Sequence, residues 1–177
     1  MKTFEFSIIA SGLDPEADDF ESRFYDAGCD DATISFQKGH IILDFARDAE
    51  SIDEAVSSAI EAVSSTGAAV NRVEPDPLVN LSEIASRVGM TRQAITQYSK
   101  GQRGKDFPAP VVKITTDSPL WDWPDVALWF FRQGRIPRDA VIEAEVVKAA
   151  NRILESEDRD FSSGLKKRIA ELESIAR

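Results

Sequence analysis

Along residues 1–75 the hydrophobic positions recur either at every second residue, as in a half-buried strand, or at every third or fourth, as in an amphipathic helix. Asp14-Pro15 has the composition of a helix start, and Gly28 that of a helix end. A capping box at residues 51–54 predicts a second helix, which Gly67 ends. The pattern also predicts strands at residues 4–8, 33–36, 40–45 and 68–73, with Lys38-Gly39 as a two-residue hairpin turn.

The predicted order of elements in this segment is strand, helix, strand, strand, helix, strand, which is the order of a ferredoxin-like sandwich. Pro75 and Pro77 then mark a junction, because proline lacks a backbone donor and disfavours helix in the residue before it. We expect an α+β fold in three parts. These are a ferredoxin-like βαββαβ domain at residues 1–75, a central domain at 78–136 and C-terminal helices at 137–177.

The C-terminal part shows helical spacing twice. Pro137 opens the first helix, residues 155–160 form a polar break, and a last helix is expected at residues 164–177. The expected apolar stripes are Ile142, Val146, Ala149 and Ile153 in the first helix and Leu165, Ile169 and Leu172 in the last.

The most informative segment, residues 81–98, has the pattern of two short helices joined by a tight turn. Ala85 is small enough to let the helices approach closely, and Gly89 can take the positive φ that the turn needs. Ile95 can fill the space between the helices. The segment resembles a helix-turn-helix of the MerR/excisionase-like winged type. The expected N-caps of the two helices are Ser82 and Thr91.

The residues that follow extend the resemblance. A basic loop occupies residues 100–105, and residues 107–112 together with Trp121 bracket a predicted β-hairpin wing. Residues 123–129 are expected to form a helix that packs beneath the wing. The resemblance covers residues 78–132 and implies a central winged helix-turn-helix that binds double-stranded DNA.

Polar side chains are predicted to gather on one side of the second helix of this motif, at ~100° per residue. Arginine can form two hydrogen bonds with guanine, glutamine can do so with adenine, and threonine can contact a base or a thymine methyl group. A residue at the helix start is well placed for a phosphate. The alternative is an ordinary solvated helix face and loop. We predict base contacts from Arg92, Gln93, Thr96 and Gln97, and phosphate contacts from Thr91, Lys100, Arg103 and Lys105.

The net charge of −10 argues at first against nucleic acid, but the charge is unevenly distributed. Residues 1–77 carry 17 acidic and 5 basic side chains, and residues 139–177 carry 9 and 7. Residues 78–138 carry 5 acidic and 9 basic side chains, so the helix-turn-helix lies in the only basic segment. The acidic first domain should therefore face away from DNA. It is either a module for dimerisation or partner binding, or its charge serves solubility alone.

Few residues suit catalysis or metal binding. Cys29 is the only cysteine and His40 the only histidine, which excludes a disulfide, a cysteine-based zinc site and a histidine-rich metal site. The acidic pair Asp30-Asp31 is expected to lie in a solvated turn rather than at a metal. We expect no enzyme activity, no cofactor and no metal. The chain has no apolar run long enough to span a membrane and no signal-peptide pattern at its start, so a cytoplasmic protein is expected.

The function expected from the sequence is that of a sequence-specific DNA-binding transcriptional regulator, a repressor rather than an activator. The resemblance suggests a homodimer on an inverted repeat, with Ile142, Val146, Ile153, Leu165, Ile169 and Leu172 as interface residues unless they pack within the monomer. One alternative is an antitoxin or adaptor whose acidic domain binds a protein partner while the winged domain autoregulates its operon. Another is an architectural protein that bends DNA.

Overall fold

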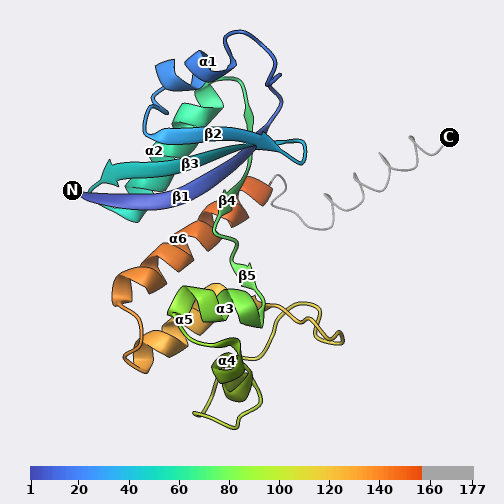
Figure 1. The fold of residues 1–177 in the computed structure, drawn as a ribbon. Coiled ribbons are helices and arrows are strands. Elements are labelled where there is room, and N and C mark those ends of the chain that lie inside the picture. The colour runs from blue at the N-terminus through green and yellow to red at the C-terminus, as the bar shows by residue number, and fades with distance from the viewer. Residues whose placement is uncertain (157–177) are drawn as a thin grey trace, which may run out of the picture.

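A computed structural model describes residues 1–156 and shows a mixed α+β protein with an open antiparallel sheet (Figure 1). The elements of this part of the chain are β1 (Lys2–Ser11), α1 (Phe20–Asp26), β2 (Ala32–Gln37), β3 (His40–Ala49), α2 (Ile52–Ser65), β4 (Ala69–Glu74), β5 (Leu78–Val79), α3 (Leu81–Val88), α4 (Arg92–Ser99), β6 (Trp121–Asp122), α5 (Trp123–Arg132) and α6 (Arg138–Glu155). None of the helices in residues 1–156 combines the length and the apolar character that crossing a membrane requires.

Residues 2–74 form the sheet unit, whose four strands lie in the order β2-β3-β1-β4 with antiparallel neighbours. The long β1–β3 ladder runs from Lys2 opposite Ala49 to Ala10 opposite Ile41. Lys38 and Gly39 both have positive φ, as expected for the hairpin turn between β2 and β3. The predicted succession of strands and helices is confirmed for this part of the chain.

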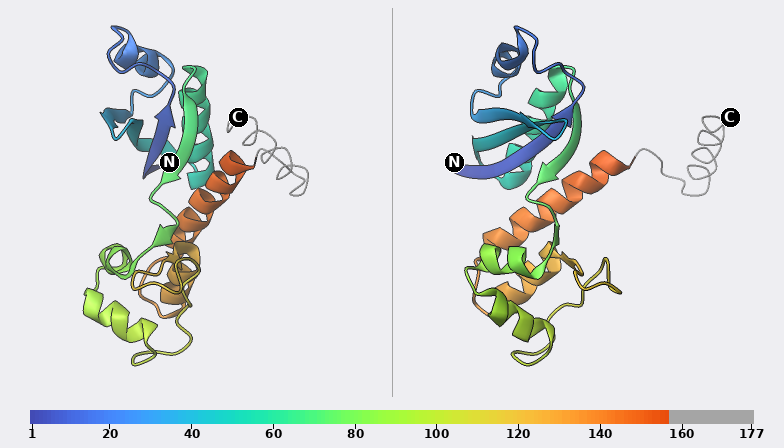
Figure 2. Two further views of the ribbon diagram at one scale, coloured as in Figure 1. Left: turned by 90° about the vertical axis from the view of Figure 1, so that its right-hand side faces the viewer. Right: turned by 45° about the vertical axis from the view of Figure 1, so that its right-hand side comes forward.

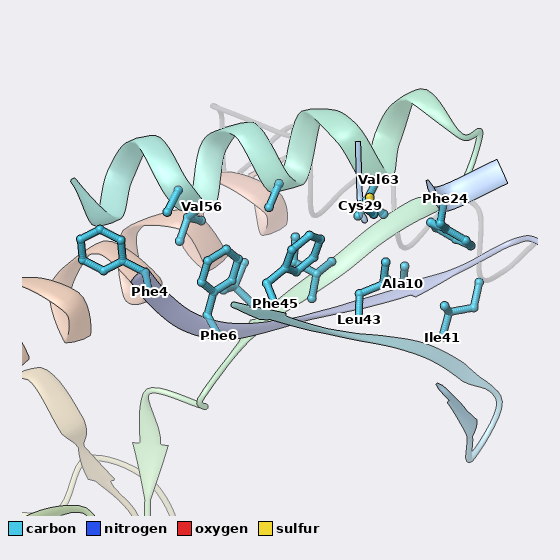
Figure 3. Close-up of a cluster of buried hydrophobic side chains, with 14 of the residues drawn as sticks. Phe4, Phe6, Ala10, Phe24, Cys29, Ile41, Leu43, Phe45, Val56 and Val63 are labelled. Atoms are coloured by element: carbon cyan, nitrogen blue, oxygen red, sulfur yellow. The ribbon is translucent and has the colours of Figure 1, made fainter. Parts of the chain in front are cut away.

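The core of the sheet unit lies between the strands and the two helices that cover one face of the sheet (Figure 3). Alternate residues of β1 and β3 point into this layer, which gives buried positions such as Phe6, Ile8 and Leu43. α2 contributes Val56 and Val63, and both are buried. The side chain of Ser51 accepts a hydrogen bond from the Glu54 N–H, so the predicted cap of α2 is confirmed.

The first helix starts later than predicted. α1 begins at Phe20 rather than at Pro15, and Asp14 instead closes a local turn by accepting a hydrogen bond from the Glu16 N–H at 2.9 Å. This outcome reflects the competition between an aspartate-stabilised turn and a helix cap, since both use the same side-chain acceptor. Gly28 has a φ of +95° just after the helix, as expected for its end.

The prediction that Asp30-Asp31 is a solvated turn is wrong for Asp31. Its carboxylate forms a two-pronged ion pair with Arg47, with N···O distances of 2.7 and 2.8 Å. The guanidinium of Arg47, whose side chain is 11% exposed, also donates to the carbonyl oxygen of Gly28 and to the hydroxyl of Ser58. The hydrogen bond with Asp31 raises the pKa of Arg47. No local sequence pattern predicts that Arg47 on β3 contacts the turn that contains Asp31.

Residues 78–136 form the central unit, whose core is mostly aromatic. β5 pairs with β6, and α5 begins directly after β6, with Asp122 as its N-cap. The rings of Tyr98, Phe107, Trp129 and Phe130 pack together, with centroid distances from 5.0 to 6.1 Å. Large aromatic rings bury enough apolar area to hold the helices and the long loop of this unit together.

α6 lies against both cores and joins the two units (Figure 2). Ala144 is buried in the core of the central unit, and Val147 is buried in that of the sheet unit. Asn151 is 4% exposed, and its side-chain amide bonds both to the N–H and to the carbonyl oxygen of Val73 in β4, at 2.8 and 2.9 Å. α6 thereby covers the outer edge of β4.

The apolar stripe predicted for this helix is wrong. Ile142, Ala149 and Ile153 are exposed and Val146 is half-buried. The buried face is instead built around small and polar residues, because α6 must approach β4 closely and satisfy its edge. The predicted polar break at 155–160 lies almost entirely outside the described residues, as do the last helix at 164–177 and the interface candidates Leu165, Ile169 and Leu172.

Candidate nucleic-acid interface

The turn between α3 and α4 has the geometry that its sequence predicts. Gly89 has a φ of +68°, and the Met90 N–H donates to the carbonyl oxygen of Ala85 at 3.0 Å. Ala85 is 5% exposed and Ile95 is fully buried, so both occupy the positions between the helices that were predicted for them. The close approach of the two helices therefore follows from a small residue, a left-handed turn and one branched apolar side chain.

One of the two predicted caps is wrong. α3 begins two residues earlier than expected, and the side chain of Asn80 accepts from the Glu83 N–H at 2.9 Å. Ser82 lies exposed within the first turn of α3. Asparagine and serine are similar in cap preference, so the sequence could not rank them. Thr91 caps α4 as predicted, and its hydroxyl accepts from the Ala94 N–H at 3.1 Å.

The outer face of α4 carries the predicted base-contacting residues in two groups. Arg92 and Gln93 are exposed at the start of the helix, next to the exposed Thr91. Thr96 and Gln97 lie one turn further on and are half-buried. The Thr96 hydroxyl donates to the carbonyl oxygen of Arg92 at 2.9 Å, so that hydroxyl proton is already used within the helix. The first turn of α4 is thus the part of the helix most accessible to a ligand.

α4 ends in a left-handed turn that starts the basic loop. Gly101 has a φ of +69°, its N–H donates to the carbonyl oxygen of Tyr98 at 3.1 Å, and the Gln102 N–H donates to that of Gln97 at 2.9 Å. Three residues later, Gly104 packs against the aromatic core. A Cβ atom at this position would lie 3.2 Å from the Trp129 ring and 3.3 Å from that of Tyr98.

Further contacts fix the loop to α5. The indole N–H of Trp129 donates to the carbonyl oxygen of Lys105 at 2.9 Å. The Arg103 guanidinium lies 5.0 Å from the centroid of the Tyr98 ring, on the buried side of α4. The side chains of Lys100, Arg103 and Lys105 are all exposed. The loop therefore has a defined backbone with charged side chains in solvent. Lys100 directly follows the outer face of α4, whereas Arg103 packs on the opposite side of that helix.

The predicted wing is much reduced. Only Val112 and Leu120 form a β-bridge, with N···O distances of 2.9 and 3.3 Å between them. Trp121 pairs with Val79 of β5 instead. Pro108 and Pro110 lack the N–H groups that a longer ladder would need, which is the physical reason for the short pairing.

Residues 113–119 form the connection between the bridged residues, and the side chains of residues 113–118 are exposed. Lys113 has a φ of +54°, and Ile114 is 65% exposed. No role was predicted for Lys113, for the exposed Arg132 at the end of α5, or for the exposed Arg135 after it. In the sequence they contribute only to the positive charge of residues 78–138, since no motif or spacing singles them out.

The positive charges of the central segment have no anionic partners in the described part of the chain. None of the nine basic residues at positions 78–138 forms an ion pair with any of residues 1–156. Four of the five basic residues at positions 1–77 do form such pairs. These pairs are Lys2 with Asp139 and Glu143, Arg23 with Asp19, Arg47 with Asp31, and Arg72 with Asp76 and Glu155.

Arg87 on α3 has a structural role at the junction between the two units. It donates to the carbonyl oxygen of Asp76 at 2.9 Å, and its guanidinium lies 5.1 Å from the centroid of the Trp123 ring. Burial lowers the pKa of this guanidinium. Arg87 thus fixes α3 to the junction between the two units and is not presented with the cations of α4 and the basic loop.

The described residues hold no group of three or more histidine, cysteine, aspartate or glutamate side chains placed to bind a metal ion. Cys29 is buried, which raises the pKa of its thiol, and His40 is exposed next to the hairpin turn, with Nδ1 3.1 Å from the carbonyl oxygen of Lys38. The best-defined chemical surface in residues 1–156 is therefore the polar and basic one on α4 and its loop. Comparisons of the chain with protein-family models, curated proteins and solved structures found no match.

Proposed function

We propose that the chain binds double-stranded DNA as a sequence-specific transcriptional regulator, with α4 in the major groove and the basic loop on the phosphate backbone. The observation that carries the proposal is the exposed pair Arg92 and Gln93 on the first turn of α4, beside a fixed loop whose cations lack partners in residues 1–156. A cation that is already paired would have to give up its internal ion pair to bind a phosphate, whereas an unpaired cation would not. Unpaired cations therefore suit an anionic partner.

The chemistry of the first turn suits recognition of base edges. Arg92 can donate two hydrogen bonds to O6 and N7 of guanine, and Gln93 can bond with N6 and N7 of adenine. The Thr91 hydroxyl accepts from the Ala94 N–H, which leaves its own proton available for a phosphate oxygen. Free N–H groups at the start of α4 favour the same anion. Gln97 and Thr96 lie deeper and would make secondary contacts.

The fixed backbone of the basic loop supports phosphate contacts. Gly104 and the carbonyl oxygen of Lys105 are held against Trp129, so the Lys105 side chain starts from a defined position. A fixed backbone lowers the entropy lost when a charged side chain is ordered on a ligand. Lys100, Arg103 and Lys105 are the proposed phosphate contacts, and Lys113 in the connection 113–119 is an added candidate.

The position of α4 agrees with the proposal. It lies at the end of the protein away from the acidic sheet unit, so phosphates bound there would be far from most of the negative charge (Figure 1). The finer architecture is also part of the proposal. The strand order β2-β3-β1-β4 supports a ferredoxin-like arrangement of the sheet unit, and the α3–turn–α4 geometry supports a winged helix-turn-helix with a minimal wing.

Selection of duplexes from a random-sequence DNA pool by the full chain tests the proposal. We expect a defined motif to be enriched by the wild type and to be lost with Arg92→Ala/Gln93→Ala. Arg23→Ala/Arg152→Ala, which removes two cations outside the central unit, is the matched control and should select the same motif. Absence of any enriched motif with the folded wild type would contradict sequence-specific binding. That result would favour the adaptor alternative, in which the acidic unit binds a protein.

A further inference from the structure

The two edge strands of the four-stranded sheet, β2 and β4, differ in what covers their outward-facing backbone groups. At β4, the side chain of Asn151 bonds to both outward-facing backbone groups of Val73, as a neighbouring strand would. At the opposite edge, β2 has β3 as its only neighbour among residues 1–156. The two-residue hairpin turn directs the N–H and carbonyl groups of Gln37, Ser35 and Thr33 toward β3. The backbone groups of Ile34 and Phe36 therefore face outward, whereas the Ala32 N–H already donates to the carbonyl oxygen of Cys29 at 3.1 Å.

This outward edge lacks the features that normally prevent pairing with another strand. Residues 32–37 contain no charged residue and no proline, and their pairing with β3 is regular. Two large apolar side chains lie nearby in solvent, Tyr25 at 65% and Phe36 at 47% exposure. Between α1 and β2 lies a pocket of about 380 Å³ whose lining includes Tyr25, Ala32 and Ile34.

We propose that β2 pairs antiparallel with β2 of a second copy of this chain, centred on Ile34, to give a continuous eight-stranded sheet. A two-fold axis perpendicular to an antiparallel sheet passes midway between a residue and its own copy, and Ile34 has the outward-facing groups that a hydrogen-bonded pair at this position needs. The pairing sets Phe36 opposite the partner's Ala32, a large side chain against a small one. Phe36 then reaches the pocket beside the partner's Tyr25.

Charge complementarity supports a second copy as the occupant and supports this register. Lys38 is the one basic residue of positions 1–77 without an ion pair in residues 1–156. Centring on Ile34 places Lys38, in the turn after β2, near the partner's Asp30, in the turn before β2, twice by symmetry. Asp30 likewise has no ion pair within the described residues, whereas Asp31 is already bound to Arg47. The edge is therefore self-complementary in shape and in charge.

One consequence rests on the proposed DNA-binding function. The central unit follows β4, at the sheet edge opposite β2, so pairing through β2 would set the two α4 helices at far ends of the dimer (Figure 1). Such a dimer cannot place both helices in successive major grooves of one short site. It would instead hold two separate duplex segments, which differs from the inverted-repeat arrangement expected from the sequence.

Sedimentation velocity of the full chain across a concentration series tests the dimer without DNA. We expect the wild type to dimerise, Phe36→Glu to be monomeric, and Lys38→Asp to weaken dimerisation about tenfold or more. Asp30→Lys/Lys38→Asp should restore dimerisation to near the wild-type level. The control Ile153→Glu, at an exposed apolar position of α6, should leave the dimer intact. Circular dichroism establishes that each variant is folded.

A wild type that stays monomeric throughout the series would overturn the proposal, as would a folded Phe36→Glu variant that still dimerises. Loss of the dimer with Ile153→Glu alone would also overturn it and place the interface on α6. Co-capture of two differently labelled duplexes then separates the two proposals. Phe36→Glu should lose co-capture yet bind a single duplex. A dimer that binds no duplex supports the β2 pairing and contradicts only the DNA-binding function.

Discussion

Four of the five basic residues at positions 1–77 are bound to carboxylates within the protein, whereas none of the nine at positions 78–138 forms an ion pair with residues 1–156. The sheet unit is strongly acidic, so its few cations find partners at short range. The central unit keeps its cations other than Arg87 in solvent, although acidic side chains are abundant elsewhere in the chain. We propose that charge serves internal stability in one unit and external binding in the other.

The two cores differ in a parallel way. The sheet unit buries alternate residues of long strands, and its packing follows from the ladder itself. The central unit has few ladder hydrogen bonds, and aromatic rings and indole N–H groups fix its loops instead. Loops held by side-chain contacts can present charged groups at fixed positions without being part of a helix or a β-ladder. This property suits a binding unit.

The largest effect is expected for Arg47→Ala, which breaks the internal charge network of the sheet unit. Removing one partner leaves the half-buried Asp31 and the carbonyl oxygen of Gly28 without their donor. We expect unfolding free energy to fall by about 3 kcal/mol, measured by urea denaturation. Arg23→Ala, which removes an exposed pair with Asp19, is the control and should cost less than about 1 kcal/mol. Equal losses for the two variants would contradict the internal role of Arg47.

A somewhat smaller effect is expected at the covered edge of the sheet. Asn151→Ala removes both side-chain hydrogen bonds to Val73 and leaves an N–H and a carbonyl group buried without partners. We expect a loss of about 2 kcal/mol in the same assay. Arg152→Ala, at the next and exposed position, should change stability by only about 0.5 kcal/mol. If the two variants behave alike, α6 does not hold the edge of β4.

Two glycines of the basic loop allow a finer test of the central unit. Gly101 and Gly104 have nearly the same φ, +69° and +70°, so alanine costs about 1 kcal/mol at either position for backbone strain. Only at Gly104 would the new methyl group press against Trp129 and Tyr98. We therefore expect the unfolding free energy of Gly104→Ala to be about 1 kcal/mol lower than that of Gly101→Ala, measured by thermal or urea unfolding. Identical stabilities would mean that the aromatic core does not fix the loop.

The smallest effect is expected for single cations of the loop. Lys100→Ala should leave stability nearly unchanged, because the side chain is exposed at the end of α4. If Lys100 contacts a phosphate, the slope of log affinity against log salt should fall in magnitude by about 1. Arg152→Ala, at an exposed position of α6, removes the same charge and should leave the slope unchanged. A similar change for both variants would mean that net charge alone drives binding.

The sequence predicted local structure well where one signal acts alone. The Lys38-Gly39 turn, the Gly89 turn and the Thr91 cap each depend on one residue type with a distinct conformational preference. The packing roles of Ala85 and Ile95 followed from the same motif. Prediction failed where distant parts of the chain compete.

The failures have a common physical origin in long-range contacts. The buried face of α6 is set by the backbone of β4, so Asn151 is buried while Ile153 is exposed, against hydrophobic periodicity. The wing is short because two prolines interrupt its ladder and β5 takes Trp121 as a partner. The Arg47–Asp31 pair joins residues 16 positions apart on different elements, and no local pattern encodes it. For the candidate site, the sequence identified the residue types of α4, and the structure ranked them by exposure.

Fluorescence anisotropy of the wild-type chain on a selected duplex and on its scrambled version, across a salt series, tests the central claim most directly. We expect a slope of log affinity against log salt of about −3 or steeper, since each phosphate neutralised by Lys100, Arg103 or Lys105 contributes about −0.9. We also expect a preference for the selected duplex that Arg92→Ala/Gln93→Ala removes with little change in slope. A slope near zero, or an undiminished preference in that variant, would contradict the assignment of DNA binding to α4 and its basic loop.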